Sequence, residues 1–132
     1  VDWWKNVLHF TEEQVWALLE KYKVTPPVPY RLGWGRSSCM TCIFNSPKIW
    51  STISTYYPER AQLIAGYEQK FDCTISRSKI DVVSLSNRIE PFDIQDMEAL
   101  VQSKIESYYL PVFTDNWTVP PGAFNKEGCG SL

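Results

Sequence analysis

The chain has 132 residues, a formal net charge of −2 and a calculated pI near 5.4, and 44% of its residues are hydrophobic. This length predicts one domain with a hydrophobic core. The mildly acidic balance excludes a general electrostatic attraction to nucleic acid or anionic membranes, and no apolar run approaches the roughly 18 residues of a membrane-spanning helix. Four cysteines without a recognisable signal peptide favour a reducing cytoplasm, with thiols or a metal rather than disulfides.

The first predicted helix covers residues 12–23. Thr11 and Gln14 form a capping-box sequence at its start. Apolar side chains then recur at helical spacing, namely Val15, Leu18, Leu19 and Tyr22. The proline-rich run at 26–29 ends this helix, because a residue before proline avoids the helical conformation.

Two further helices are predicted on either side of a proline. Ser46 is a cap residue followed by proline at the first helical position, so a helix is expected over 47–57. Pro58 interrupts the pattern, and the next helix runs from about 59 to 71. The side chains expected to face inward from it are Leu63, Ile64, Tyr67 and Phe71.

The rest of the chain carries weaker patterns. Residues 80–85 fit a short strand or an extended connector, and Asp93 is the predicted cap of a last helix over 94–107. Residues 111–132 turn polar and rich in proline and glycine, which is typical of a tail. The predicted fold class is therefore mainly α, with a helical region over 1–110 and this tail.

The most informative feature is a Cys-x-x-Cys pair, Cys39 and Cys42, within a predicted ordered loop over residues 24–45. Two thiols at this spacing can ligate one metal or form a redox dithiol. In either case their sulfurs must converge. The pair indicates metal, redox or anion chemistry without choosing among them.

Basic side chains around the pair predict a local anion site. Arg36 stands three residues before Cys39, where a guanidinium would bind phosphate or sulfate and would favour the thiolate form of a neighbouring cysteine. Arg31 and Lys48 are companion candidates. The predicted anion-binding set is therefore Arg36, Arg31 and Lys48.

The remaining cysteines allow a second interpretation. Cys73 follows an amphipathic segment and fits a small buried hydrophobe, but it is also a candidate ligand. Together, Cys39, Cys42, Cys73 and Cys129 could hold one structural zinc in an interaction module for protein or nucleic acid, without catalysis. The only histidine, His9, lies between apolar neighbours, and no catalytic triad can be built around it.

Several stretches, taken in order, resemble the phosphoadenosine phosphosulfate (PAPS) reductase family, particularly its phage and mobile-element members. Residues 7–16 (VLHFTEEQVW) are similar to the family's P-I-x-x-W-T-x-x-D-V-W segment, and Pro29, Tyr30 and Gly33 to its H-P-x-Y-x-x-G segment. Residues 36–42 (RSSCMTC) are similar to its S-R-x-x-C-x-x-C segment. The resemblance covers about residues 3–70.

The resemblance implies the helical C-terminal region of an adenine-nucleotide-hydrolase-like α/β protein of the PP-loop group. The implied activity is reduction of a sulfonucleotide, as in a phosphoadenylyl-sulfate reductase, or nucleotide-dependent sulfur transfer. The implied cofactors are a [4Fe-4S] cluster or zinc at Cys39 and Cys42, with an adenine nucleotide bound by another half. Cys129, flanked by glycines, is similar to the nucleophilic cysteine of a mobile tail in some relatives.

The chain departs from the family in one main respect. It carries no Ser-Gly-Gly-x-Asp-Ser phosphate loop, so we expect a nucleotide-binding half before Val1 or on another chain, and no catalysis without it. Such a fragment should expose apolar surface to its partner or in a homodimer. The side chains expected at that surface, partly exposed or covered by another chain, are Trp3, Trp4, Trp34 or neighbouring aromatic residues.

Overall fold

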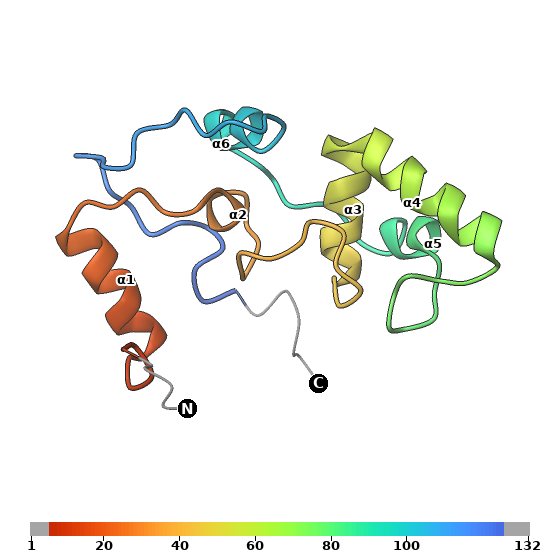
Figure 1. Cartoon of the computed structure of the whole chain (residues 1–132), viewed down its shortest axis with the longest axis horizontal. Coiled ribbons are helices and arrows are strands. Elements are labelled where there is room, and N and C mark those ends of the chain that lie inside the picture. Colours follow the sequence, from red (N-terminus) through yellow and green to blue (C-terminus); the bar gives the residue numbers. More distant parts are fainter. Residues whose placement is uncertain (1–5, 126–132) are drawn as a thin grey trace, which may run out of the picture.

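A computed structural model describes residues 6–125 and shows a mainly helical molecule. Six helices lie in this range, and it contains no strand beyond one isolated bridge between Val24 and Phe113. Helix α1 lies at one end of the molecule and helices α3, α4 and α5 gather at the other, with α2 and α6 between them (Figure 1). The predicted helical class is confirmed.

The helix starts follow from local capping. In α1 (Glu12–Lys21) the Thr11 hydroxyl accepts a hydrogen bond from the Gln14 N–H, and the Gln14 side chain accepts one from the Thr11 N–H. In α3 (Pro47–Tyr56) the Ser46 hydroxyl accepts one from the Ile49 N–H. These caps satisfy N–H groups that a helix leaves unpaired in its first turn. Both predicted caps are confirmed.

Helix α4 (Pro58–Phe71) starts at Pro58, as proline at a first helical position allows. Its inward side differs from the prediction. Leu63, Tyr67 and Phe71 are exposed by 47%, 48% and 63%, while Glu68 is buried. The prediction that these three side chains point inward is therefore wrong, and the face that packs on α3 and α5 carries smaller apolar residues and Glu68.

Between residues 80 and 107 the structure differs from the prediction in three places. Residues 80–85 do not form a strand or extended connector: α5 (Val82–Ser86) begins there, because the Asp81 carboxylate accepts the Ser84 N–H and caps it. The last helix, α6 (Met97–Gln102), is shorter than the expected 94–107. Its cap is Asp96 rather than Asp93, and the carboxylate of Asp96 accepts the Ala99 N–H.

The main core joins α2 (Val28–Arg31) to the helices that follow it. Its largest fully buried side chains include two from α3, Trp50 and Ile53, which are both 0% exposed. The other members come from α3, α5, α6 and the loops: Leu32, Trp34, Ile49, Tyr57, Val82, Leu85, Ile94, Ala99 and Leu100. Trp34 is buried in this core and is therefore not one of the exposed aromatic residues; Trp3 and Trp4 lie outside the described residues.

Residues 110–125 lie against residues 23–34 (Figure 1). Backbone hydrogen bonds join Thr25 to Val112 and Thr114 to Lys23, and the Trp117 indole donates to the Val24 carbonyl. Gly122 approaches the carbonyl oxygens of Tyr30 and Trp34 so closely that a Cβ atom would clash with them. The first part of the predicted tail is therefore hydrogen-bonded along the segment that leads into the cysteine loop.

No helix within the described residues is long and apolar enough to cross a membrane.

Candidate functional site

The loop that carries Cys39 and Cys42 is fixed at both ends. Gly33 opens it with a φ of 99°, a conformation that favours glycine, and Trp34 anchors it in the core. At the far end, the Asn45 side chain donates to the Met40 carbonyl at 2.5 Å and the Asn45 N–H donates to the Cys42 carbonyl at 3.0 Å. These bonds fix the backbone of residues 40–45, which includes Cys42.

Arg36 points at Cys42. Its Nη2 lies 2.9 Å from the Cys42 Sγ, with the guanidinium donating to the sulfur. Cys42 is half-buried and Cys39 is exposed, and both are free thiols in the structure. The loop therefore brings a cation directly onto one of the two sulfurs and leaves the other open to solvent.

Two cavities lie beside this loop and share three lining residues, Met40, Tyr57 and Ser103. The larger, about 660 Å³, is also bordered by Thr41 and by residues 58–60 at the start of α4. The smaller, about 330 Å³, is mostly apolar, with Trp34 and Ile105 among its walls. Cavities of a few hundred Å³ with apolar walls and a few polar groups are typical ligand sites. Met40, which lies between the two cysteines, thus lines both cavities, and Thr41 lines the larger one.

The larger cavity contains cationic and hydroxyl groups. Arg60 and Lys104 line it together with Glu59, and neither cation forms an ion pair within residues 6–125. The Tyr57 hydroxyl lies 2.7 Å from the Ser103 hydroxyl. Burial raises the pKa of Tyr57, and the bond to Ser103 only partly offsets this, so the phenol stays neutral at physiological pH. The lining therefore suits an anion better than a cation.

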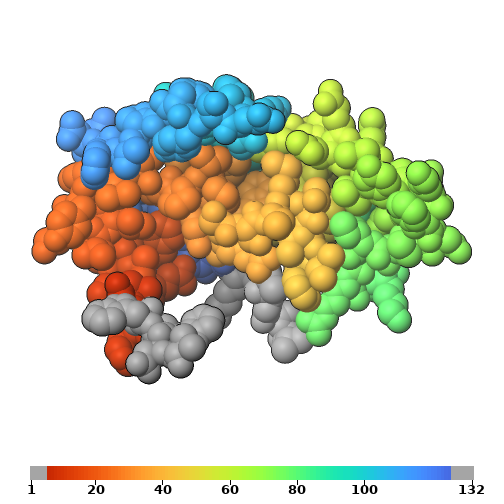
Figure 2. Space-filling model, in the orientation of Figure 1, coloured from red at the N-terminus to blue at the C-terminus, as the bar shows by residue number. Residues whose placement is uncertain are grey.

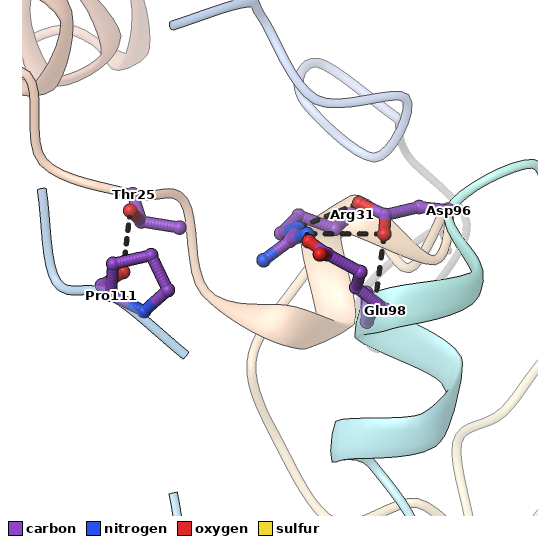
Figure 3. Close-up of polar contacts among 6 residues, drawn as sticks. Thr25, Arg31, Asp96, Glu98 and Pro111 are labelled. Carbon is purple, nitrogen blue, oxygen red and sulfur yellow. Dashed lines mark hydrogen bonds and ion pairs between the residues drawn. The ribbon is translucent and has the colours of Figure 1, made fainter. Parts of the chain in front are cut away.

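Arg31 lies in a different setting, at the contact between α2 and α6 (Figure 3). Its Nε and Nη2 donate to the two carboxylate oxygens of Asp96 at 2.7 and 3.1 Å, and Nη2 lies 3.6 Å from Glu98. Burial alone would raise the pKa of Asp96. The hydrogen bonds from Arg31 and Ala99 and the charge of Arg31 outweigh burial and hold that pKa below its ordinary value. Arg31 is thus already paired with a carboxylate, and it lines a cavity of about 220 Å³ together with Asp96 and Glu98.

Lys48 is engaged with an aromatic ring. Its Nζ lies 4.9 Å from the ring centroid of Phe92, and that ring packs against Trp34 with centroids 5.7 Å apart. An ammonium group over an aromatic face is attracted by the ring electrons. Of the three predicted anion-binding residues, the structure thus brings Arg36 to the cysteine pair, pairs Arg31 with Asp96 and places Lys48 over Phe92.

The other predicted ligands do not complete a metal site within the described residues. Cys73 is an exposed free thiol that follows α4 and borders a separate cavity of about 270 Å³ with Asp72 and Asp81. No group of three or more His, Cys, Asp or Glu side chains that could hold a metal occurs in residues 6–125. Cys129 lies outside this range. A four-ligand site at Cys39 and Cys42 would need further ligands from elsewhere.

Sequence reasoning missed the cavity residues Tyr57, Arg60, Ser103 and Lys104. For Tyr57 and Arg60 the only local signal is Pro58, where the helical pattern is interrupted between α3 and α4. Ser103 and Lys104 follow α6, and nothing in the sequence places them opposite residues 57–60. No family model, no curated protein and no solved structure matches the chain.

Proposed function

We propose that this chain is the helical C-terminal portion of a PAPS-reductase-like enzyme that reduces a sulfonucleotide or transfers sulfur in a nucleotide-dependent reaction. The observation that carries the proposal is the 2.9 Å contact between Arg36 and Cys42 beside the two cavities. The nucleotide-binding PP-loop half would lie on another part of the protein or on another chain. The compartment that suits such free thiols is the cytoplasm.

The chemistry of the pair supports this proposal. Reducing a sulfonucleotide to sulfite takes two electrons, and two thiols supply two electrons when they join in one disulfide and release two protons. Cys39 is exposed and can be attacked or can attack, while Cys42 is held by Arg36. A cationic side chain in contact with a sulfur is a typical setting of a reactive cysteine. Arg60 and Lys104 add positive charge to the cavity where an anionic substrate would approach.

Cysteine variants of the full-length enzyme test this function. Cys39→Ser or Cys42→Ser should reduce sulfite release from phosphoadenosine phosphosulfate by at least about 100-fold, since the reaction loses a reacting thiol. Cys73→Ser is the matched control, because it removes a free thiol that borders a different cavity. Unchanged turnover in both variants of the pair would contradict the proposal.

Metal analysis of anaerobically purified enzyme separates the chemical routes. Iron with sulfide, lost in Cys39→Ser, would indicate that the pair ligates a cluster completed by residues outside 6–125. Zinc without turnover would favour the non-catalytic interaction module. Turnover without any metal would support the dithiol route.

A further inference from the structure

The two cavities beside the cysteine loop differ in polarity, and they adjoin at a pair of hydroxyl groups. Tyr57 and Ser103 line both cavities, and their hydroxyl oxygens lie 2.7 Å apart. The segment that follows α6 meets the start of α4 and the cysteine loop here, where cyan, yellow-green and gold surfaces adjoin in the upper part of Figure 2. The hydroxyl pair therefore lies between a charged compartment and an apolar one.

The smaller cavity suits an apolar ring. Its walls include Leu32 and Trp34 from the core, with Ile105 and Tyr108 at its exposed side. Aromatic walls such as these pack well against another ring. Glu106 also borders this cavity, and its carboxylate repels an anionic group. The charged end of an anionic ligand is therefore directed toward the larger cavity.

The larger cavity suits that anionic end. Arg60 and Lys104 border it together with Glu59, so two cations against one carboxylate leave it positively charged. The ammonium group of Lys104 lies 5.3 Å from the ring centroid of Tyr57, which places a cation close to the hydroxyl pair. A carboxylate or phosphate that binds these cations therefore lies next to Tyr57.

The hydroxyl pair selects for a hydrogen-bond donor. The Ser103 Oγ lies 2.6 Å from the Leu100 carbonyl oxygen, and because a carbonyl has no proton, Ser103 donates to it. The phenol stays protonated, since burial raises the pKa of Tyr57, and it donates its proton to the Ser103 oxygen. The Tyr57 oxygen then has only an acceptor position left. A ligand beside it gains a hydrogen bond if it carries a hydroxyl or N–H group.

We propose that the two cavities form one binding site, complete within this chain, for a small organic anion with three parts. An apolar ring occupies the smaller cavity, an anionic group binds beside Arg60 and Lys104, and a hydroxyl or N–H group between them donates to Tyr57. The order of these parts follows the order of apolar wall, hydroxyl pair and cations in the structure. The site needs neither cysteine and no nucleotide-binding half, so its binding can be measured apart from the proposed reaction.

Matched ligands separate the three contributions. Phenyllactate carries the ring, the hydroxyl and the carboxylate, and titration of the isotope-labelled 132-residue chain followed by NMR should show binding in the millimolar range, as is typical of a ligand of about twelve heavy atoms. Phenylpropionate lacks the hydroxyl, lactate lacks the ring, and the methyl ester of phenyllactate lacks the charge. Each should bind at least about threefold more weakly than phenyllactate.

Charge variants place the anionic end. Arg60→Gln and Lys104→Gln change exposed side chains and should each weaken the binding of phenyllactate by about threefold, while the binding of its methyl ester stays the same. Arg88→Gln is the matched control, because Arg88 is exposed and borders a separate cavity. If the first two variants weaken binding no more than Arg88→Gln, the proposal is overturned.

Tyr57→Phe tests the hydrogen bond. It removes the acceptor oxygen, so phenyllactate should bind this variant no better than phenylpropionate does. Thermal unfolding followed by circular dichroism shows whether the variant is folded, and comparison of two ligands on the same variant cancels any general loss of binding. The proposal is overturned if the preference for phenyllactate persists in Tyr57→Phe. It is equally overturned if the unchanged protein binds phenyllactate no better than the methyl ester, or does not bind it at about 10 mM.

Discussion

Helices α1 and α3 have the same local design and very different surroundings. Each has ten residues, a hydroxyl cap and an amphipathic pattern. In α3 five residues are buried, while in α1 only Trp16 is, and Val15 and Leu18 remain exposed by 37% and 41%. A capping residue and an amphipathic pattern are therefore enough to start a helix. How much that helix contributes to stability depends on how much of its apolar side is buried by the rest of the chain.

The attachment of α1 is correspondingly small. The Trp16 ring meets the Tyr30 ring edge to face with centroids 5.0 Å apart, and its indole donates to the Glu12 carboxylate at 3.2 Å. Helix α3 instead packs on both α4 and α5. If this contrast is correct, substitutions at equivalent apolar positions should have very different effects on the free energy of unfolding.

The largest effect is expected at Ile53. Ile53→Ala removes a fully buried side chain from the centre of the core and leaves a cavity, which should lower the free energy of unfolding by about 2–5 kcal/mol. Chemical denaturation followed by circular dichroism measures this loss. A loss below about 1 kcal/mol would mean that α3 is not the centre of the fold.

A smaller but still large effect is expected at Glu68, which connects three elements. Its two carboxylate oxygens accept the N–H groups of Ile75 and Val82, both at 2.9 Å. Glu68→Ala leaves both unpaired and should cost about 1–3 kcal/mol for each N–H that stays buried. Glu68→Gln keeps one acceptor oxygen, so its loss of stability should lie between that of Glu68→Ala and that of the unchanged protein. Gln69→Ala, on the exposed side of α4, is the control and should change little.

The pH dependence of stability tests the contact between α2 and α6. Because the pKa of Asp96 is lowered in the folded state, this carboxylate stabilises the fold at pH values above its unfolded pKa of about 3.9. That contribution is lost as the pH falls through the folded pKa. Asp96→Asn should therefore flatten the fall in stability below about pH 4 while lowering stability near pH 7. If Asp96→Asn and the unchanged protein lose stability equally below about pH 4, the ion pair between Asp96 and Arg31 is contradicted.

The smallest effect is expected on α1. Leu18→Ala removes a side chain that is already 41% exposed and replaces it with a better helix former. The free energy of unfolding should change by less than about 0.5 kcal/mol. A loss comparable with that of Ile53→Ala would show that α1 is covered in solution, for example by the nucleotide-binding half proposed above.

The sequence predicted the parts of the fold that depend on local chemistry. Thr11, Ser46 and Pro58 each start a helix where expected. The errors fall where tertiary packing decides. Ile94 looks like the first turn of a helix, but it is buried in the core before the helix begins, so Asp96 becomes the cap. The valines at 82 and 83 favour a strand, but the Asp81 cap and the burial of Val82 and Leu85 select a short helix.

The candidate site was predictable only in part, for the same reason. Arg36 and Cys42 are six residues apart in one loop, so their contact is a local property of the sequence. The cavity wall formed by Tyr57 and Ser103 joins residues 46 positions apart, which no short pattern encodes. Arg31 is prominent in the sequence as a cation near the cysteines, but its pairing with Asp96 depends on how α6 packs on α2.

The measurement that tests the account most directly is the alkylation rate of each cysteine at pH 7, followed by mass spectrometry of peptides. With Arg36 2.9 Å from Cys42, Arg36→Gln should slow the reaction of Cys42 with iodoacetamide several-fold, because the sulfur loses the guanidinium that contacts it. Cys73, which borders a different cavity, should react as before. Equal rates for Cys42 in the two proteins would contradict the claim that Arg36 and Cys42 form one reactive unit.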